Sequence, residues 1–182
     1  MKPLFTVHAG ELVAGDYIER TFHRVKVWVP AKDTGVDLLV SDATAKKTVS
    51  LQVKFSRDFL ATHLPAVFQT PLRACGWWTL NRQKIAASPA DYWVFVLVGF
   101  ERRSTDFVIL QPAELLKRLE AIHGNPKSLQ SYFWVTEKHR CWETRGLKRG
   151  DQLLIAQGQF NDDKRDFTAY LNNWQAIKEL NE

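Results

Sequence analysis

The fold is decided by the stretch Gly35-Val36-Asp37-Leu38-Leu39-Val40, which is followed by Gln52-Val53-Lys54. Both segments are predicted to be β-strands, in which successive side chains point to opposite faces. Gln52 and Lys54 therefore share one face of their strand. The polar segment 41–47 between the two strands is long enough to turn the chain back as an antiparallel hairpin. Such a hairpin would bring Asp37 beside Gln52.

The composition is that of an ordinary globular protein, with 45% hydrophobic and 25% charged residues in 182. This length predicts one domain, 1–182, with a core that needs no disulfides. No apolar run reaches the ~20 residues of a membrane-spanning helix, so no membrane partner is expected. The first residues lack the apolar core of a signal peptide, which predicts a cytoplasmic protein. Cys75 and Cys141 are then expected to be buried thiols, with a disulfide as the alternative.

The remaining elements follow from apolar periodicity and from breaker residues. Helical spacing and stop signals predict helices over 9–22, 81–87, 112–122 and 167–180. Strand patterns outside the hairpin predict strands over 24–29, 76–80, 92–100, 107–110, 132–135 and 153–155. The run 92–100 is continuously apolar, which is typical of a strand covered on both faces.

Glu11 falls on the apolar stripe of the predicted N-terminal helix, together with Ala14, Ile18 and Phe22. A carboxylate on a buried face is costly unless a cation receives it, so this position indicates a functional role. A second interpretation is that Glu11 stabilises the helix N-terminus, where negative charge is favoured. Glu19, about 80° away on the helical wheel, is the rival carboxylate.

This order of elements and motifs resembles the PD-(D/E)XK nuclease superfamily, which includes many restriction endonucleases and Holliday-junction resolvases. The motifs that carry the likeness to a small prokaryotic branch are Gly10-Glu11-Leu12, 35–40 and Gln52-Val53-Lys54-Phe55-Ser56. The resemblance covers residues 9–100. It implies an α/β fold with a restriction-endonuclease-like core (αβββαβ), whose central mixed sheet is flanked by helices. Residues 101–182 would then form an α/β extension that packs on this core.

The resemblance also implies a catalytic site for Mg²⁺-dependent phosphodiester hydrolysis, in which Mn²⁺ would substitute. Asp37 would be the principal metal ligand, and Glu11 would contribute directly or through a water. The side-chain oxygen of Gln52 and the backbone carbonyl of Val53 would be further ligands, since Mg²⁺ binds few carboxylates and keeps several waters. Lys54 would orient the attacking water and stabilise negative charge at the phosphate.

The implied substrate is nucleic acid, with DNA expected rather than RNA. The net charge of +5 is compatible with a polyanionic partner but does not require one. Phosphate contacts need basic side chains around the cleft; the candidates are Arg57, Arg73, Arg82 and Lys84, with Arg102, Arg103 and the stretch 138–149 as further ones. Each also has the interpretation of an ordinary surface charge. Trp77 and Trp78 must face opposite sides of a strand, and Trp78 is assigned to base stacking.

Two departures from the family pattern leave other functions open. Gln52 stands where many relatives carry Glu, and Gly15 stands where some carry a second Glu. The first alternative is therefore a catalytically inactive nucleic-acid-binding module of the same fold. The second is an RNA-directed nuclease or a toxin domain. A homodimer, whose two sites would cut two strands, is implied by the resemblance alone.

Overall fold

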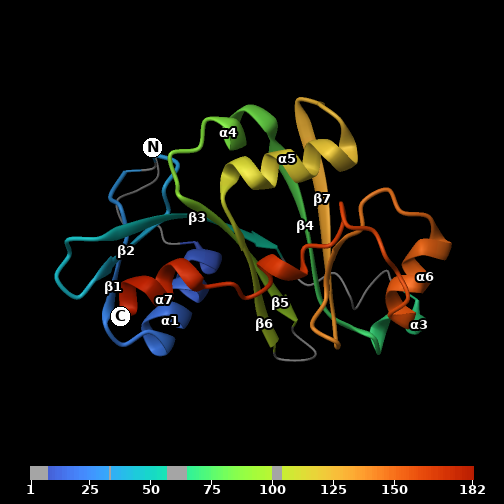
Figure 1. The fold of residues 1–182 in the computed structure, drawn as a ribbon, viewed down its shortest axis with the longest axis horizontal. Helices are drawn as coiled ribbons and strands as arrows, with labels where there is room; N and C mark the ends of the chain where they lie inside the picture. Colours follow the sequence, from blue (N-terminus) through green and yellow to red (C-terminus); the bar gives the residue numbers. More distant parts are fainter. Residues whose placement is uncertain (1–7, 33, 57–64, 100–103) are drawn as a thin grey trace.

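The computed structural model describes residues 8–32, 34–56, 65–99 and 104–182, and it has an α/β fold with two sheets (Figure 1). The central sheet has the strand order β1-β2-β3-β5-β6, and the smaller sheet has the order β4-β7-β8. Helices flank both sheets, as Figure 1 shows. The predicted α/β class with a central sheet and flanking helices is therefore confirmed.

The central sheet is mixed. Its strands are β1 (Val25–Trp28), β2 (Leu38–Asp42), β3 (Thr48–Ser56), β5 (Tyr92–Gly99) and β6 (Ser104–Leu110). The strands β1, β2 and β3 form an antiparallel meander, which confirms the predicted hairpin, and β5 and β6 are also antiparallel. Only β3 and β5 pair in parallel within this sheet. A parallel pair needs a long crossover, and here the crossover contributes to the second sheet.

The crossover and the C-terminal half build the second sheet together. The crossover contains α3 (Ala66–Gln69), β4 (Leu72–Asn81) and α4 (Arg82–Ala86). The C-terminal half supplies α5 (Pro112–His123), β7 (Ser128–Thr136), β8 (Cys141–Glu143) and α6 (Arg149–Gln157). In the smaller sheet, β4 of segment 9–100 pairs with β7 of segment 101–182. In the central sheet, β6 of segment 101–182 pairs with β5 of segment 9–100. Each sheet therefore contains strands from both segments.

Two layers of apolar side chains hold the sheets. On one face of the central sheet, α1 (Ala9–Thr21) and α7 (Gln175–Asn181) pack through residues such as Ile18 and Ile177 (Figure 1). Between the two sheets lies a second cluster, which includes Trp78, Phe95 and Phe133. β5 contributes to both clusters, which explains why its sequence is apolar at successive positions.

The tight loop between β2 and β3 is organised by one carboxylate. Asp42 accepts hydrogen bonds from the Thr44 hydroxyl (2.6 Å) and from the backbone N–H groups of Lys46 (2.8 Å) and Lys47 (3.1 Å). These bonds, that of Thr44 above all, lower the pKa of the Asp42 carboxyl. Ala45 takes up a positive φ of 57° in this turn. The polar composition of 41–47 therefore fixes the register of the hairpin on which the cleft is built.

Two predicted elements in the C-terminal half are wrong. Residues 153–155 are not a strand but part of α6, whose buried residue Ile155 packs on Phe68 and Trp134. The predicted helix over 167–180 is broken into the 3-10 turn η1 (Thr168–Tyr170) and α7. Asn172 causes the break, because its backbone N–H and its side-chain oxygen bond the carbonyl (2.6 Å) and the N–H (2.8 Å) of Phe107 on β6.

The structure also answers two expectations from composition. Cys75 and Cys141 are both buried thiols, and no disulfide joins them. Burial raises the pKa of the Cys141 thiol well above its usual value, with a smaller contribution from nearby carboxylates. Among the described residues, no helix has both the length and the apolar content that crossing a membrane requires.

Candidate active site

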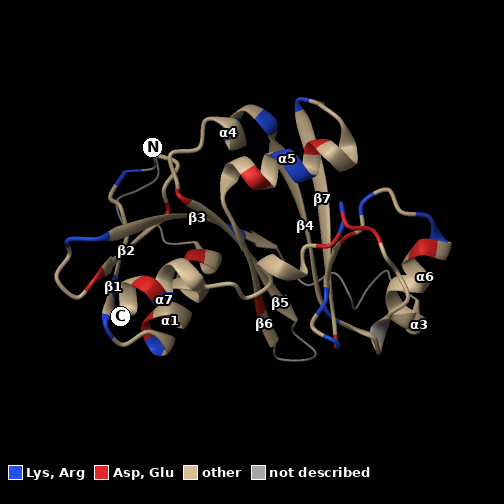
Figure 2. Cartoon of the chain, in the orientation of Figure 1, with Lys and Arg blue, Asp and Glu red and all other residues tan. Residues whose placement is uncertain are grey.

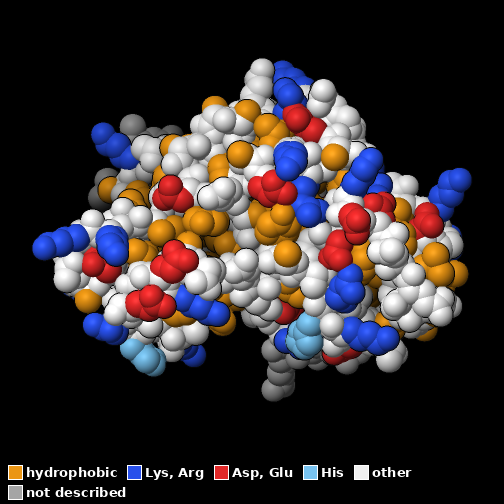
Figure 3. Space-filling view, in the orientation of Figure 1, with side chains coloured by type: hydrophobic (Ala, Val, Ile, Leu, Met, Phe, Trp, Pro, Cys, Tyr) orange, Lys and Arg blue, Asp and Glu red, His pale blue; other side chains and the backbone are white. Residues whose placement is uncertain are grey.

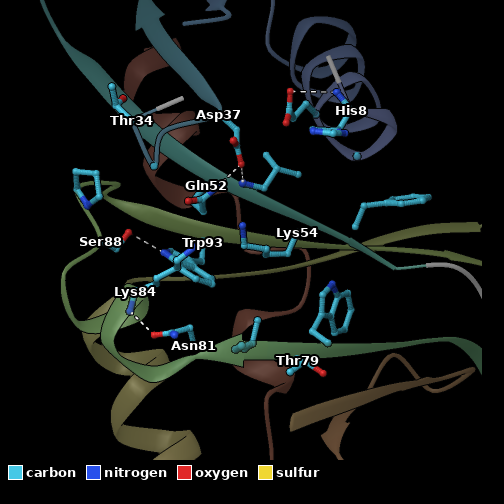
Figure 4. Close-up of a pocket in the computed structure, with 18 of the residues that line it drawn as sticks. His8, Thr34, Asp37, Gln52, Lys54, Thr79, Asn81, Lys84, Ser88 and Trp93 are labelled. Carbon is cyan, nitrogen blue, oxygen red and sulfur yellow. Dashed lines mark hydrogen bonds between the residues drawn. The ribbon is translucent and has the colours of Figure 1, made fainter. Parts of the chain in front are cut away.

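A cleft of about 1210 Å³ opens between the N-terminus of α1, the strand β3 and the segment that joins β4 to β5. Figure 4 shows Asp37, Gln52 and Lys54 on one side of this cleft, with Asn81, Lys84, Ser88 and Trp93 across from them. Glu11 lines the same cleft. The structure therefore brings together the four side chains to which the sequence assigned catalytic roles.

Asp37 is held by β3 through two hydrogen bonds to one carboxylate oxygen. The backbone N–H of Val53 donates to Oδ2 at 2.8 Å, and the side-chain amide of Gln52 donates to the same atom (Figure 4). The backbone N–H of Asp37 in turn donates to the carbonyl of Leu51 at 2.8 Å. Asp37 is only 7% exposed. The predicted placement of Asp37 beside Gln52 is confirmed, and the carboxylate is fixed before any ligand arrives.

Gly35 lets the chain enter β2 at this point. Its φ of +86° is a conformation that side chains other than glycine rarely adopt. A Cβ atom would also stand 3.1 Å from Cδ of Pro89, which lines the same cleft. Glycine is therefore favoured two residues before Asp37, in the segment that leads into β2.

Lys54 lies two positions beyond Gln52 and, like it, lines the cleft. Its Nζ lies 5.1 Å from the centroid of the Trp93 indole, within the range of a cation–π contact. The indole is itself oriented, because its Nε1 donates to the Ser88 hydroxyl at 2.8 Å. A half-buried ammonium is thus held over an aromatic ring within the cleft.

The position of Glu11 is compatible with both interpretations that the sequence left open. It is 5% exposed, and its carboxylate accepts the backbone N–H of His8 at 3.2 Å, as expected for an acid in the first turn of a helix. It also lines the cleft, whereas Glu19 is exposed beside a separate hollow near Phe22. The structure therefore favours Glu11 over Glu19 as the helix carboxylate of this site.

The donors in the cleft fit a hard divalent cation. Asp37 and Glu11 supply carboxylates, and Gln52 supplies an amide whose oxygen and nitrogen exchange places by a half-turn. The N–H and C=O of a strand residue point to the same side, so the carbonyl of Val53 faces the edge where Asp37 lies. Over the described ranges, no cluster of three or more His, Cys, Asp or Glu residues suits a metal ion. The set fits Mg²⁺, which needs one or two carboxylates and retains waters.

Of the predicted phosphate-contacting residues that the structure describes, only Lys84 lines the cleft. It is exposed in α4, whose first turn is capped when the Asn81 side chain accepts the Lys84 backbone N–H at 3.1 Å. Arg82, in the same helix, instead forms an ion pair with Glu120 of α5 at 2.5 Å. Arg57 lies outside the described residues.

Two further residues that were predicted to contact nucleic acid, Arg73 and Trp78, contact other parts of the fold instead. Arg73, near the start of β4, forms an ion pair of 2.9 Å with the buried Asp106 of β6 and does not line the cleft. Trp78 lines the cleft, but its ring is 6% exposed and packs against Phe95 and Phe133. The two adjacent tryptophans do face opposite sides, and Trp77, at 46% exposed, is the one available for stacking.

Sequence reasoning missed Trp93 and Ser88, which orient Lys54. No local signal in the sequence marks them, because Trp93 comes to lie opposite Gln52 only through the parallel register of β3 and β5. Basic and acidic side chains alternate over the face seen in Figure 3, so no field of one sign marks a binding surface there. No family model, no curated protein and no solved structure matches this chain. Function is therefore inferred from the chemistry of the cleft.

Proposed function

We propose that this chain is a metal-dependent nuclease of restriction-endonuclease-like fold that hydrolyses phosphodiester bonds in DNA. The observation that carries this proposal is the convergence of Asp37, Gln52 and Lys54 with Glu11 in one cleft. Asp37 and Glu11 are both buried carboxylates, and a divalent ion held by both would offset the cost of burying two negative charges. The Lys54 ammonium, two positions beyond Gln52 on the same face of β3, would then stabilise the negative charge of a bound phosphate.

Each residue has a distinct role in this proposal. Asp37 and Glu11 would hold Mg²⁺, with the oxygen of the Gln52 amide and the carbonyl of Val53 completing the protein ligands. When bound, Mg²⁺ supplies charge neutralisation at the phosphate and acidifies a coordinated water. Lys54 donates hydrogen bonds to the attacking water or to a phosphate oxygen, and it stabilises the charge that develops there. Lys84 contacts a neighbouring phosphate across the cleft.

A second candidate is a nucleic-acid-binding domain of the same fold that does not cleave. The observation that favours it is the contact between Gln52 and Asp37, in which the amide nitrogen faces the carboxylate. An amide in place of a carboxylate also removes one formal negative charge from the site. Weaker metal binding would follow, and binding without turnover would be the result.

Cleavage assays separate these candidates. The purified protein is incubated with linear, supercoiled, branched and single-stranded DNA, and with tRNA, in Mg²⁺ or Mn²⁺. We expect cleavage of DNA that is abolished by EDTA, by Asp37→Ala and by Lys54→Ala. Binding of DNA without cleavage in either metal would favour the second candidate, and cleavage of tRNA alone would identify an RNA-directed enzyme.

The helix carboxylate is tested with a matched pair of variants. Glu11→Gln should raise the Mg²⁺ concentration needed for half-maximal cleavage, whereas Glu19→Gln, on the exposed side of the same helix, should not. A larger effect at Glu19 would contradict the ligand set. We further propose a homodimer acting on two strands, which light scattering of the purified protein tests directly.

A further inference from the structure

Trp77 is a large aromatic side chain that the fold leaves in solvent. It lies on β4 with 46% of its surface exposed, while the next residue, Trp78, fills the core between the sheets. The guanidinium of Arg145 lies 5.8 Å from the centroid of the Trp77 ring. The exposed part of this indole, with an arginine beside it, offers a flat surface for an aromatic ligand.

The position of Trp77 links it to the cleft. Its backbone N–H donates to the hydroxyl of Ser56 at 3.0 Å, and Ser56 follows Lys54 by two residues on β3. Thr79 shares the face of Trp77, because the two are alternate residues of β4, and Thr79 lines the cleft. The ring therefore lies just beyond the end of the cleft where β3 and β4 meet.

The segment that supplies Arg145 carries further basic residues. The connection from β8 to α6 carries the exposed side chains Arg145, Lys148 and Arg149. Figure 2 shows basic residues, with the acidic first-turn residue Asp151 beside them, where α6 begins. The guanidinium of Arg149 lies 4.3 Å from the centroid of the Phe68 ring. This charge complements a polyanion such as a nucleic-acid backbone.

We propose that Trp77 and Arg145 form a stacking platform for an unpaired base of single-stranded nucleic acid. Bases in a duplex are already paired and stacked, so they present only edges, whereas an unpaired base offers the face that an indole needs. Lys148 and Arg149 would contact the phosphates that flank this base. The inference rests on the proposed function for what happens in the cleft, and it names the substrate as a strand with unpaired bases next to the scissile phosphate.

The test is a binding measurement in EDTA, so that it does not depend on cleavage. Fluorescence anisotropy is recorded with a labelled oligothymidylate and with a blunt duplex of the same length. Trp77→Ala should weaken binding of the single strand about fivefold or more and change duplex binding little. Trp77→Phe should retain most of the affinity. Arg145→Gln should also weaken binding of the single strand, and Lys148→Gln should reduce the slope of log affinity against log salt by about 0.7.

Trp28→Ala is the matched control, because Trp28 is a similarly exposed tryptophan (52%) on the edge strand β1. It should bind the single strand like the wild type. Equal losses in Trp28→Ala and Trp77→Ala, or no loss in Trp77→Ala and Arg145→Gln, would overturn the platform. Binding of polyglutamate but of neither oligonucleotide would overturn it as well. If the wild type cleaves DNA and Trp77→Ala binds the single strand normally, the platform is wrong and the nuclease proposal stands. If Trp77→Ala weakens single-strand binding but the wild type cleaves no DNA, the platform stands without the nuclease.

Discussion

The carboxylate of Asp37 and the side-chain amide of Gln52 are in hydrogen-bond contact across the hairpin of β2 and β3, with the Val53 N–H bonded to the same oxygen at 2.8 Å. Asp37 directly precedes β2, and Gln52 lies in the middle of β3. The Gln52 amide is a neutral hydrogen-bond donor to this buried carboxylate. Under the proposed function, we expect the charge at position 52 to affect both the stability of the protein in EDTA and its affinity for a cation.

Gln52→Glu should therefore lower the thermal unfolding midpoint in EDTA, because two carboxylates would share one site. Mn²⁺ should raise the midpoint of this variant by more than it raises that of the wild type. The two charges should couple by about 0.5–3 kcal/mol in a double-mutant cycle with Asp37→Asn. Differential scanning fluorimetry with and without Mn²⁺ measures both effects. An unchanged midpoint in EDTA would mean that the two side chains do not share a site.

Lys54→Ala should reduce the cleavage rate about 10²–10³-fold while DNA binding falls only slightly, because the ammonium acts on charge that develops in the transition state. Lys84→Ala is the control, since Lys84 is an exposed lysine lining the same cleft. It should weaken binding and lower the salt dependence, but it should leave the rate at saturating DNA unchanged. Single-turnover kinetics distinguish the two. Similar losses of rate in both variants would argue against a catalytic role specific to Lys54.

The parts of the site that could be predicted depend on local periodicity. Alternation along β3 places Gln52 and Lys54 on one face, and the helical period places Glu11 inward, so each follows from a few neighbouring residues. The hairpin loop also carries its own signal in Asp42, whose side chain bonds the turn.

The parts that could not be predicted depend on distant partners. Arg73 and Arg82 lie away from the cleft because Asp106 and Glu120, far along the chain, pair with them. The place of Trp93 under Lys54 follows from the register of a parallel pair, which no local pattern encodes. The segment 153–155 was misassigned because a short apolar run does not distinguish a strand from the buried side of a helix.

Substitutions at two glycines of α1 should have opposite effects on stability, because the helix approaches the sheet more closely at Gly10 than at Gly15. A Cβ on Gly10 would stand 2.6 Å from Cβ of Phe55 on β3, so Gly10→Ala must push the helix and Glu11 away from the cleft. We expect a loss of about 1–3 kcal/mol of unfolding free energy. A Cβ on Gly15 would lie 3.6 Å from Cγ1 of Val27, an ordinary contact, so Gly15→Ala should be neutral or stabilising by up to about 1 kcal/mol. Urea unfolding of both variants checks the order, and a more damaging Gly15→Ala would refute the packing.

Asp166, which lies outside the cleft lining, should make the stability of the protein depend on pH. Burial opposes ionisation, but hydrogen bonds from Thr168 (backbone N–H, 2.8 Å) and the ion pair with Arg140 (2.6 Å) outweigh it and lower the pKa of Asp166. A carboxyl whose pKa is lower in the folded than in the unfolded protein stabilises the fold at pH values above its unfolded pKa. This stabilisation is lost as the pH falls through the folded pKa. Asp166→Asn should therefore lower the thermal midpoint at pH 7, and the difference from the wild type should shrink below about pH 4. A difference that stays constant from pH 7 to about pH 2.5 would show that the charge of Asp166 is not what matters.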